Sequence, residues 1–184
     1  MQDSFDGERD TFLRKAWPNT NASGSGFLDA LGDPSNTGAE QVALVHWDLS
    51  GVTLAGQTEL CSAELDFTLV SATVDSYSIY AAKRAWDFSQ ATWNNATSTV
   101  AWEIAGAQGA TDRGSLVGYV YPTGSGAKTV SASIAPYIVA NWIDHPEQNY
   151  GLIIASHSSS DNLVVYSDRA SSPTNRPMLR LVVH

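Results

Sequence analysis

The stretch WDFSQATWNNATSTVAW, residues 86–102, holds three tryptophans and a pair of adjacent asparagines. Flat indole faces can stack on the C–H side of a pyranose ring, and amide groups can hydrogen-bond its hydroxyls. The stretch is therefore a candidate sugar-binding platform, with Trp86 and Asn94 as contacts. The same residues could instead plug one end of a β-sandwich core, with Trp86 and Trp93 packed inward and Asn94 and Asn95 holding the turn.

Basic side chains near these aromatic residues form a second candidate set. The chain has only ten Lys and Arg residues, so four of them in two short segments are a large share of its positive charge. If the segments 10–17 and 74–84 are neighbours in space, they form a local basic patch that suits a uronic acid or a sulfate group. The alternative is that they are solvated strand ends. The candidate ligand contacts of this set are Arg14, Lys15, Trp17, Lys83 and Arg84.

The sequence does not predict an enzyme, and we expect no catalytic residue. The four histidines stand in unrelated contexts, and none has metal-ligand spacing to another His or to the single Cys. The acidic pair Glu64 and Asp66 is two positions apart and alternates with Leu65 and Phe67, which predicts a solvated strand face. A carboxylate pair for glycoside hydrolysis would instead need a cleft between its members.

Acidic residues near the amino end are weak candidates for a structural Ca²⁺ site. Asp3, Asp6 and Asp10 cluster there, while Asp161 and Asp168 flank a late strand. Carboxylates and main-chain carbonyls are the ligands that Ca²⁺ prefers. The simpler interpretation is an acidic solvated surface, because the chain has no Asp-x-Asp-x-Asp-Gly loop. We expect that no cofactor is required.

Overall charge and hydropathy exclude several classes of partner. The net charge is −9 at pH 7 and the pI is about 4.6, so the protein repels nucleic acid phosphates. No apolar run approaches the length of a membrane span. The start, MQDSFDGERD, lacks the basic and apolar regions of a signal peptide. The single cysteine, Cys61, shares its strand phase with Ala63 and Leu65, which predicts a buried core thiol.

Period-two alternation of apolar residues dominates the chain, and clusters of Gly, Asn, Asp, Pro and Ser separate the runs. This pattern is typical of a single all-β domain over residues 1–184, with 1–9 as a possible extended N-terminal arm. The predicted strands are 10–16, 27–31, 42–49, 58–70, 74–84, 100–104, 116–121, 127–134, 150–156, 162–168 and 178–183.

One helix is predicted at about 135–144. Pro136 suits the first helical turn, and Ile134, Ile138 and Trp142 repeat at intervals of four residues along one face. Pro146 ends the pattern. We expect this helix to cap one end of the sandwich, with Trp142 in the core, and the strand alternation places Trp47 in the core as well.

Several segments, taken in order, resemble the DNRLRE-type domain, which is also classed as carbohydrate-binding module family 96. The likeness covers almost the full length, although no single motif is diagnostic. Two features depart from the family pattern: His46 stands where the family commonly has Arg, and the loop GDPSNTG (32–38) is longer than usual. The matching segments are DTFLRKAWPNTN (10–21), VALVHWDLS (42–50), AELDFTL (63–69), WDFSQATWNN (86–95), NYGLII (149–154) and YSDRASSPTNRPMLRLVV (166–183).

The resemblance implies a non-catalytic, secreted module that binds polysaccharide. It also implies that Trp86 and Trp93 form a structural corner, since these family positions recur whatever the ligand. We therefore predict an antiparallel jelly-roll β-sandwich with one short capping helix, located extracellularly or on a virion surface. The alternative is a structural virion protein, a phage head decoration or tail appendage, that contacts sister chains; Met1 and the absence of a signal peptide favour it.

Overall fold

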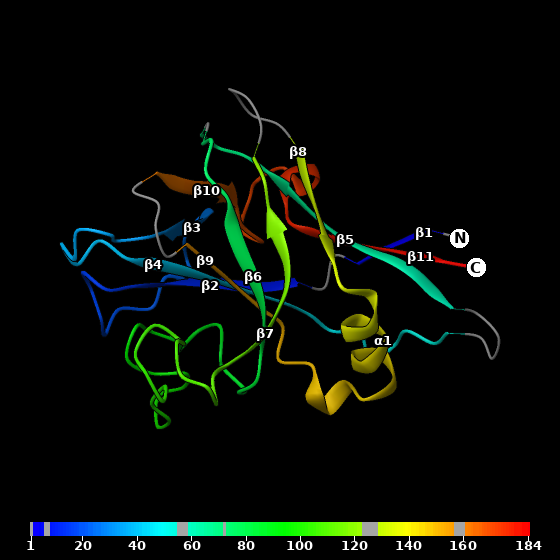
Figure 1. Cartoon of the computed structure of the whole chain (residues 1–184), viewed down its shortest axis with the longest axis horizontal. Coiled ribbons are helices and arrows are strands. Elements are labelled where there is room, and N and C mark those ends of the chain that lie inside the picture. Colours follow the sequence, from blue (N-terminus) through cyan, green and yellow to red (C-terminus); the bar gives the residue numbers. More distant parts are fainter. Residues whose placement is uncertain (1, 6–7, 55–58, 72, 123–128, 157–160) are drawn as a thin grey trace.

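The computed structural model describes residues 2–5, 8–54, 59–71, 73–122, 129–156 and 161–184, and of residues 2–5 and 8 only the backbone. Within these residues the protein is all-β with one α-helix (Figure 1). The strands are β1 (Gln2–Phe5), β2 (Glu8–Arg14), β3 (Phe27–Leu31), β4 (Gln41–Trp47), β5 (Leu60–Thr68), β6 (Tyr77–Ala82), β7 (Arg113–Val120), β8 (Thr129–Ile134), β9 (Leu152–Ala155), β10 (Asn162–Tyr166) and β11 (Met178–Val183). The helix is α1 (Pro136–Asp144), and two 3₁₀ turns are η1 (Pro146–Gln148) and η2 (Pro173–Asn175).

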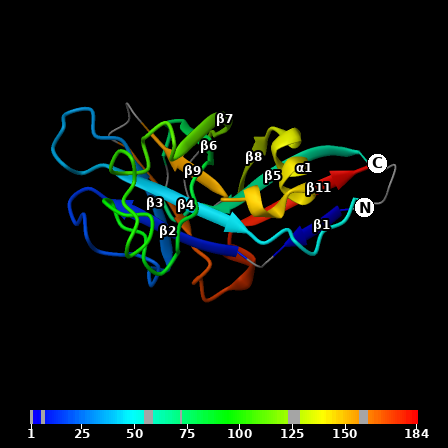
Figure 2. The ribbon, with the colours of Figure 1, turned by 90° about the horizontal axis from the view of Figure 1, so that it is seen from below.

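All of these strands join in one antiparallel sheet. Its order is β1-β11-β5-β8-β7-β6-β9-β4-β3-β10, and β2 pairs with β4 off this path. The sheet curls strongly into a half-barrel, so its two halves face each other (Figures 1 and 2). β10, the last strand in this order, returns to the end of β5. Leu69, just after β5, forms a bridge with Val165, and the Val70 amide donates to the Val164 carbonyl over 2.8 Å.

The main core fills the concave side of this sheet. Alternate residues point inward, as Leu65 and Phe67 do from β5 and Ile79 does from β6, and all three are fully buried. Trp47 and Trp142 are also buried in this core, which confirms both predictions. The helix α1 packs against β5 at one end of the core.

A second apolar core lies on the opposite face of the β2-β4-β9-β6 half. The segment 83–112 covers this face, and it forms the green loops at the lower left of Figure 1. Outward residues of the strands, such as Leu44 and Ile153, pack there against Trp93 and Trp102. Trp93 therefore does not plug the end of the main core, as the sequence suggested, but anchors a covering layer on the outside of the sheet.

The prediction of a strand at 100–104 is wrong. Ala101 forms only an isolated bridge with Asn95, and the chain then turns through 103–112. The alternation that suggested a strand has a local cause: Trp102 is buried in the second core and donates from Nε1 to the Thr92 carbonyl over 2.9 Å, whereas Ile104 is exposed.

The predicted burial of Cys61 is also wrong, because a bulge breaks the strand alternation. Val182 pairs with Ser62 but Val183 pairs with Leu60, so Cys61 is the extra residue and its thiol is exposed. The Glu64–Asp66 face differs from prediction too, since Asp66 is buried and is bound by Arg180 and by the Ser131 hydroxyl.

The predicted helix is confirmed. α1 has a proline in its first turn and ends at Asp144, just before the 3₁₀ turn that Pro146 begins. At the amino end, residues 2–5 form β1 and pair with β11 along the edge of the sheet, where an extended arm was expected. The two termini lie close together at one end of the molecule (Figure 2).

Candidate functional site

A pocket of about 280 Å³ opens beside the start of the 83–112 segment. Its lining combines aromatic rings with charged and polar groups from four separate parts of the chain. The lining residues are Arg9, His46, Ala85, Trp86, Asp87, Phe88, Asn149 and Tyr150. It is the candidate site of this protein, because ligand pockets are typically concave and aromatic-lined with few polar groups.

The β2–β4 pairing and the turn before β9 form the base of the pocket. Arg9 stands directly opposite His46 in the antiparallel register. Asn149 is buried, donates from Nδ2 to the Trp47 carbonyl over 2.7 Å and accepts the Gly151 amide at Oδ1 over 3.1 Å. These two bonds fix the turn against the end of β4.

Gly151 allows this turn to approach β4 closely. Its φ is +77°, a region that favours glycine. A Cβ atom there would clash with the Val45 carbonyl oxygen and would lie 2.9 Å from the His46 Cβ. The close approach therefore requires glycine and sets the position of His46 in the pocket base.

The start of the 83–112 segment forms the pocket wall. Trp86 donates from Nε1 to the Tyr150 carbonyl over 2.8 Å, which ties the wall to the turn. The Arg9 guanidinium carbon lies 5.5 Å from the centroid of the Phe88 ring, in cation–π range. Asp87 accepts at Oδ1 from the amide of Ser89 over 2.8 Å and from its hydroxyl over 2.6 Å, which orients the carboxylate.

His46 is the titratable group of the pocket base. Burial lowers its pKa below the ordinary value, and the nearby charge of Arg9 lowers it further. A hydrogen bond with the Asn149 main chain and the charge of Asp48 act in the opposite direction. His46 is therefore neutral at pH 7, and because one ring nitrogen donates to the Asn149 main chain, the nitrogen that is left is an acceptor.

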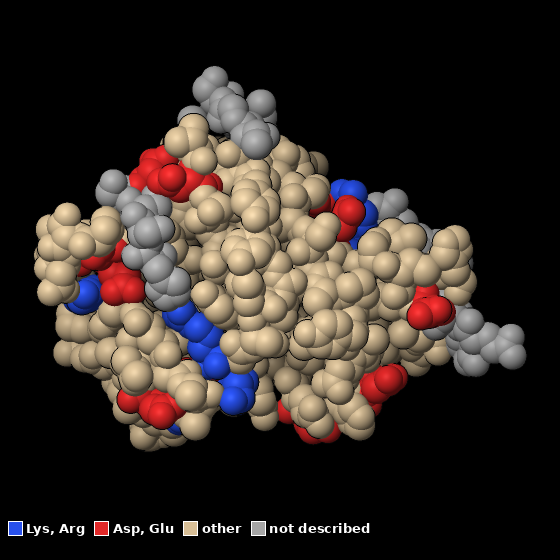
Figure 3. Space-filling view, viewed as in Figure 1, with Lys and Arg blue, Asp and Glu red and all other residues tan. Residues whose placement is uncertain are grey.

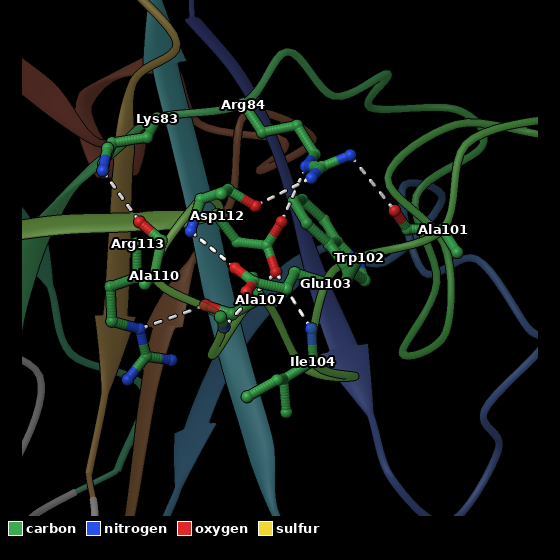
Figure 4. Close-up of polar contacts among 12 residues, drawn as sticks. Lys83, Arg84, Ala101, Trp102, Glu103, Ile104, Ala107, Ala110, Asp112 and Arg113 are labelled. Atoms are coloured by element: carbon green, nitrogen blue, oxygen red, sulfur yellow. Dashed lines mark hydrogen bonds and ion pairs between the residues drawn. The ribbon is translucent and has the colours of Figure 1, made fainter.

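The predicted contact Arg84 is part of the anchor of the 83–112 segment (Figure 4). Its Nε lies 2.6 Å from Oδ1 of Asp112, which is fully buried. The same guanidinium donates to the Thr111 hydroxyl over 2.9 Å and to the Ala101 carbonyl over 3.3 Å. Oδ2 of Asp112 accepts the Ile104 amide over 3.2 Å, so Arg84 and Asp112 together close the segment.

Lys83 completes this anchor. Its ammonium donates to the Ala110 carbonyl over 2.8 Å, and its amide donates to the Asp112 carbonyl over 2.9 Å. Lys83 and Arg84 thus fix both ends of the segment that carries the pocket wall, and neither lines the pocket.

Arg14 and Lys15 lie on a different part of the sheet from Lys83 and Arg84. Two strands, β4 and β9, separate β2 from β6 in the sheet. Moreover, Arg14 pairs with Gln41 at the start of β4. The amide of Ala82, the residue before Lys83, donates to the Gly151 carbonyl, and Gly151 lies against His46 near the end of β4. The basic patch that the sequence suggested is therefore not brought together.

Each basic residue at the end of β2 has partners of its own. The Arg14 guanidinium lies 5.4 Å from the Phe12 centroid and 4.9 Å from that of Trp17. Lys15 Nζ lies 3.5 Å from Glu40 Oε2 and 3.8 Å from Asp33 Oδ2, while Trp17 is 57% exposed beside Arg14. None of these three predicted contacts lines the pocket.

Asn94 contacts another loop and does not line the pocket. Its Nδ2 donates to Asn19 Oδ1 over 2.9 Å, and its amide donates to the Pro18 carbonyl over 3.1 Å. Asn94 thus joins the 83–112 segment to the loop that follows β2.

The candidate metal ligands do not form a described site. Asp10 is buried and accepts the Asp168 amide at Oδ2 over 2.6 Å, while Asp6 and the Asp3 side chain lie outside the described residues. Burial raises the pKa of Asp168, against the charges of nearby arginines and a hydrogen bond with Asp10. No group of three or more His, Cys, Asp or Glu residues in the described chain is arranged to hold a metal ion.

Comparison with known proteins does not assign a function to this chain, so the assignment of a function rests on the site itself. No family model matches the chain, and no curated protein matches its sequence. No helix in the described part of the chain is long and apolar enough to cross a membrane.

Sequence reasoning found only one pocket residue, Trp86. It missed Arg9, Phe88 and Tyr150, and it noted His46 only as a departure from a family pattern. Phe88 lies within the quoted aromatic stretch, so that stretch carried a usable signal. Arg9 carried none, because only the register of β2 with β4 brings it to the pocket.

Proposed function

We propose that this protein is a non-catalytic binding module whose pocket takes a sugar unit of a polysaccharide. The observation that carries the proposal is the pocket lining, in which Trp86, Phe88 and Tyr150 stand beside Arg9 and Asp87. Aromatic faces pack against the C–H side of sugars, and charged groups hydrogen-bond their hydroxyls more strongly than neutral groups do. We further propose that the module acts outside the cell or on a virion surface.

The strand order supports a jelly roll as the scaffold, which is the fold that the resemblance to the DNRLRE-type domain implies. One half of the curled sheet has the order β1-β11-β5-β8, and the other has β7-β6-β9-β4. β1 and β2 follow each other in sequence and belong to opposite halves, so they act as one strand that crosses between them. A jelly roll has two facing sheets of four strands each, and here β2, β3 and β10 are additional to the eight strands named above.

We assign different roles to the pocket residues. The Phe88 ring, with Arg9 beside it, offers a stacking face, and the Trp86 indole is fixed by its bond to Tyr150. Arg9 and Asp87 offer a donor and an acceptor for sugar hydroxyls. The remaining nitrogen of neutral His46 can accept a hydrogen bond at the base.

Glycan array binding and affinity electrophoresis test this proposal. The wild-type chain should retain at least one polysaccharide, and Phe88→Ala or Arg9→Ala should weaken retention about fivefold or more, because each removes one contact worth about 1 kcal/mol or more. Arg169→Ala is the matched control, since Arg169 is exposed and lies outside the pocket lining.

Two outcomes would contradict the proposal. One is an absence of retention on neutral, uronate and sulfated glycans alike. The other is retention that Phe88→Ala and Arg9→Ala leave unchanged. Release of reducing ends during prolonged incubation with a retained glycan would contradict the non-catalytic part. A chain that retains no glycan but assembles with sister chains would instead support a structural role in a particle.

A further inference from the structure

Two exposed tyrosines lie side by side on the outer face of β7 and just beyond its end. Tyr119 is 39% exposed and Tyr121 is 60% exposed, and their ring centroids are 5.6 Å apart with the planes tilted by 35°. Val120, between them, is fully buried in the main core. Because alternate strand residues point to opposite sides, both rings face away from the core.

The neighbouring strands add hydroxyl groups to this face. On β8, the apolar residues Val130, Ala132 and Ile134 are buried in the main core. The alternate residues Thr129, Ser131 and Ser133 are exposed on the same outer side as the tyrosines. On β6, Ser78 stands directly opposite Tyr119 in the strand register. We name this surface, formed by Ser78, Tyr119, Tyr121, Thr129, Ser131 and Ser133, the tyrosine face.

Among the residues that the structure describes, the tyrosine face carries no charged side chain. In Figure 3 the described surface in the middle of the view, over β6, β7 and β8, shows no Lys, Arg, Asp or Glu. The nearest charges across β8 belong to a group on β5 and β11 that is paired within itself. Arg180 lies 3.3 Å from Glu64 Oε2 and also binds Asp66, and the Ser131 hydroxyl donates to Asp66.

These observations select the chemistry of a partner. An exposed aromatic pair without charges offers a highly charged polymer no counter-charge. A second copy of the chain would bring a net charge of −9 toward another −9. Paired aromatic faces beside a row of hydroxyls instead match the C–H faces and hydroxyls of sugar rings.

We propose that the tyrosine face is a second binding surface, on which an uncharged polysaccharide chain lies across Tyr119 and Tyr121 and hydrogen-bonds to the hydroxyls of Thr129 and Ser133 on β8. The face shares no residue with the pocket, and the inference stands on its own observations rather than on the function proposed for the pocket.

Affinity electrophoresis in gels that contain galactomannan, xyloglucan or mixed-linkage β-glucan tests the inference. The test variant is Tyr119→Ala/Tyr121→Ala, and Tyr121→Ala alone is a milder one. The matched control is Tyr137→Ala, because Tyr137 is a 64% exposed tyrosine on α1, outside the tyrosine face. Phe88→Ala reports on the pocket in the same gels. Far-UV circular dichroism and thermal unfolding check that each variant folds.

The inference predicts that at least one neutral gel retards the wild type. The double variant should bind it roughly tenfold more weakly, the single variant a few-fold more weakly, and Tyr137→Ala as the wild type does, while any weakening in Phe88→Ala reports on the pocket. Loss of retardation in Phe88→Ala but not in the tyrosine variants would overturn this inference and leave the pocket proposal standing. The opposite pattern would support the inference and count against the pocket.

Two further results would overturn the inference. The first is that none of the three neutral polysaccharides retards the wild type. The second is a wild-type dimer in sedimentation velocity that Tyr119→Ala/Tyr121→Ala converts to a monomer, because the face would then be occupied by a second copy of the chain.

Discussion

Replacing Asp112 by alanine should destabilise the protein more than almost any other change in a loop. Asp112 is fully buried, and its Oδ1 lies 2.6 Å from Arg84 Nε. Its Oδ2 accepts the amides of Ile104 over 3.2 Å and Gly109 over 3.3 Å. Asp112→Ala removes both functions at once, and the guanidinium loses its ion-pair partner.

The size of the effect follows from the exposure of the two partners. Breaking a buried ion pair by removing one member costs about 3–5 kcal/mol. The Arg84 side chain is 28% exposed and keeps the Ala101 and Thr111 oxygens, so we expect the lower end, about 3 kcal/mol. For a chain of this length, that corresponds to a fall in Tm of about 6–12 °C. The loss is large beside a total stability of about 5–15 kcal/mol.

Urea unfolding followed by circular dichroism and tryptophan fluorescence measures the effect. Asp144→Ala is the control, because Asp144 is an exposed aspartate at the end of α1, and it should change stability by less than about 0.5 kcal/mol. Arg84→Met/Asp112→Leu should recover part of the loss, since replacing both partners by apolar groups avoids the unpaired charge. A loss below about 1 kcal/mol in Asp112→Ala would refute the argument that this pair anchors the segment 83–112.

Two further predictions concern the base of the pocket. Because burial lowers the pKa of His46 below about 6.5, the folded chain binds fewer protons in acid than the unfolded chain does. The His46 contribution to the free energy of unfolding should therefore fall as the pH drops through about 6.5, and His46→Gln should flatten this part of the urea-stability profile between pH 7.5 and 5. Gly151→Ala should cost at least about 2 kcal/mol, through its positive φ and its clash with the Val45 carbonyl, and should weaken pocket binding. Gly24→Ala, where nothing lies within 4 Å, should change little in the same urea titration, and equal costs at the two sites would contradict the close-approach argument.

Most strands and the helix were predictable because their apolar side chains repeat with the period of a strand or of a helix. Phe27–Leu31 and Met178–Val183 match the expected ranges, and α1 ends where proline and the apolar spacing require. Apolar periodicity gave a wrong prediction where the burial of a residue has a local cause. Trp102 is buried by its own loop, and Cys61 is the extra residue of a bulge, so neither follows the period of a regular strand.

The candidate site was far less predictable than the fold. Its residues come from four parts of the chain, and only the pairing of β2 with β4 and the turn at Gly151 bring Arg9 and His46 to Trp86 and Phe88. Pairing register depends on which faces are buried across the whole sheet. The second core was hidden for the same reason, because local sequence does not tell which side of a sheet a tryptophan-rich loop will cover.

The few lysine and arginine residues of this acidic chain are poor predictors of a ligand site. The chain has nineteen acidic residues and ten basic ones, so a lysine or arginine has many possible partners within the protein. A buried carboxylate such as Asp112 pairs with one of these basic side chains. Leaving such a carboxylate unpaired would strongly destabilise the fold, so the basic side chains that pair with it are not available to a ligand. Arg84 and Lys15 are both ion-paired in this way. Ligand selection then falls mainly to aromatic rings, amides and hydroxyls, together with Arg9 at the pocket. Because such groups supply little charge, binding through them should be nearly independent of salt concentration, whereas a basic patch would lose affinity steeply as salt rises.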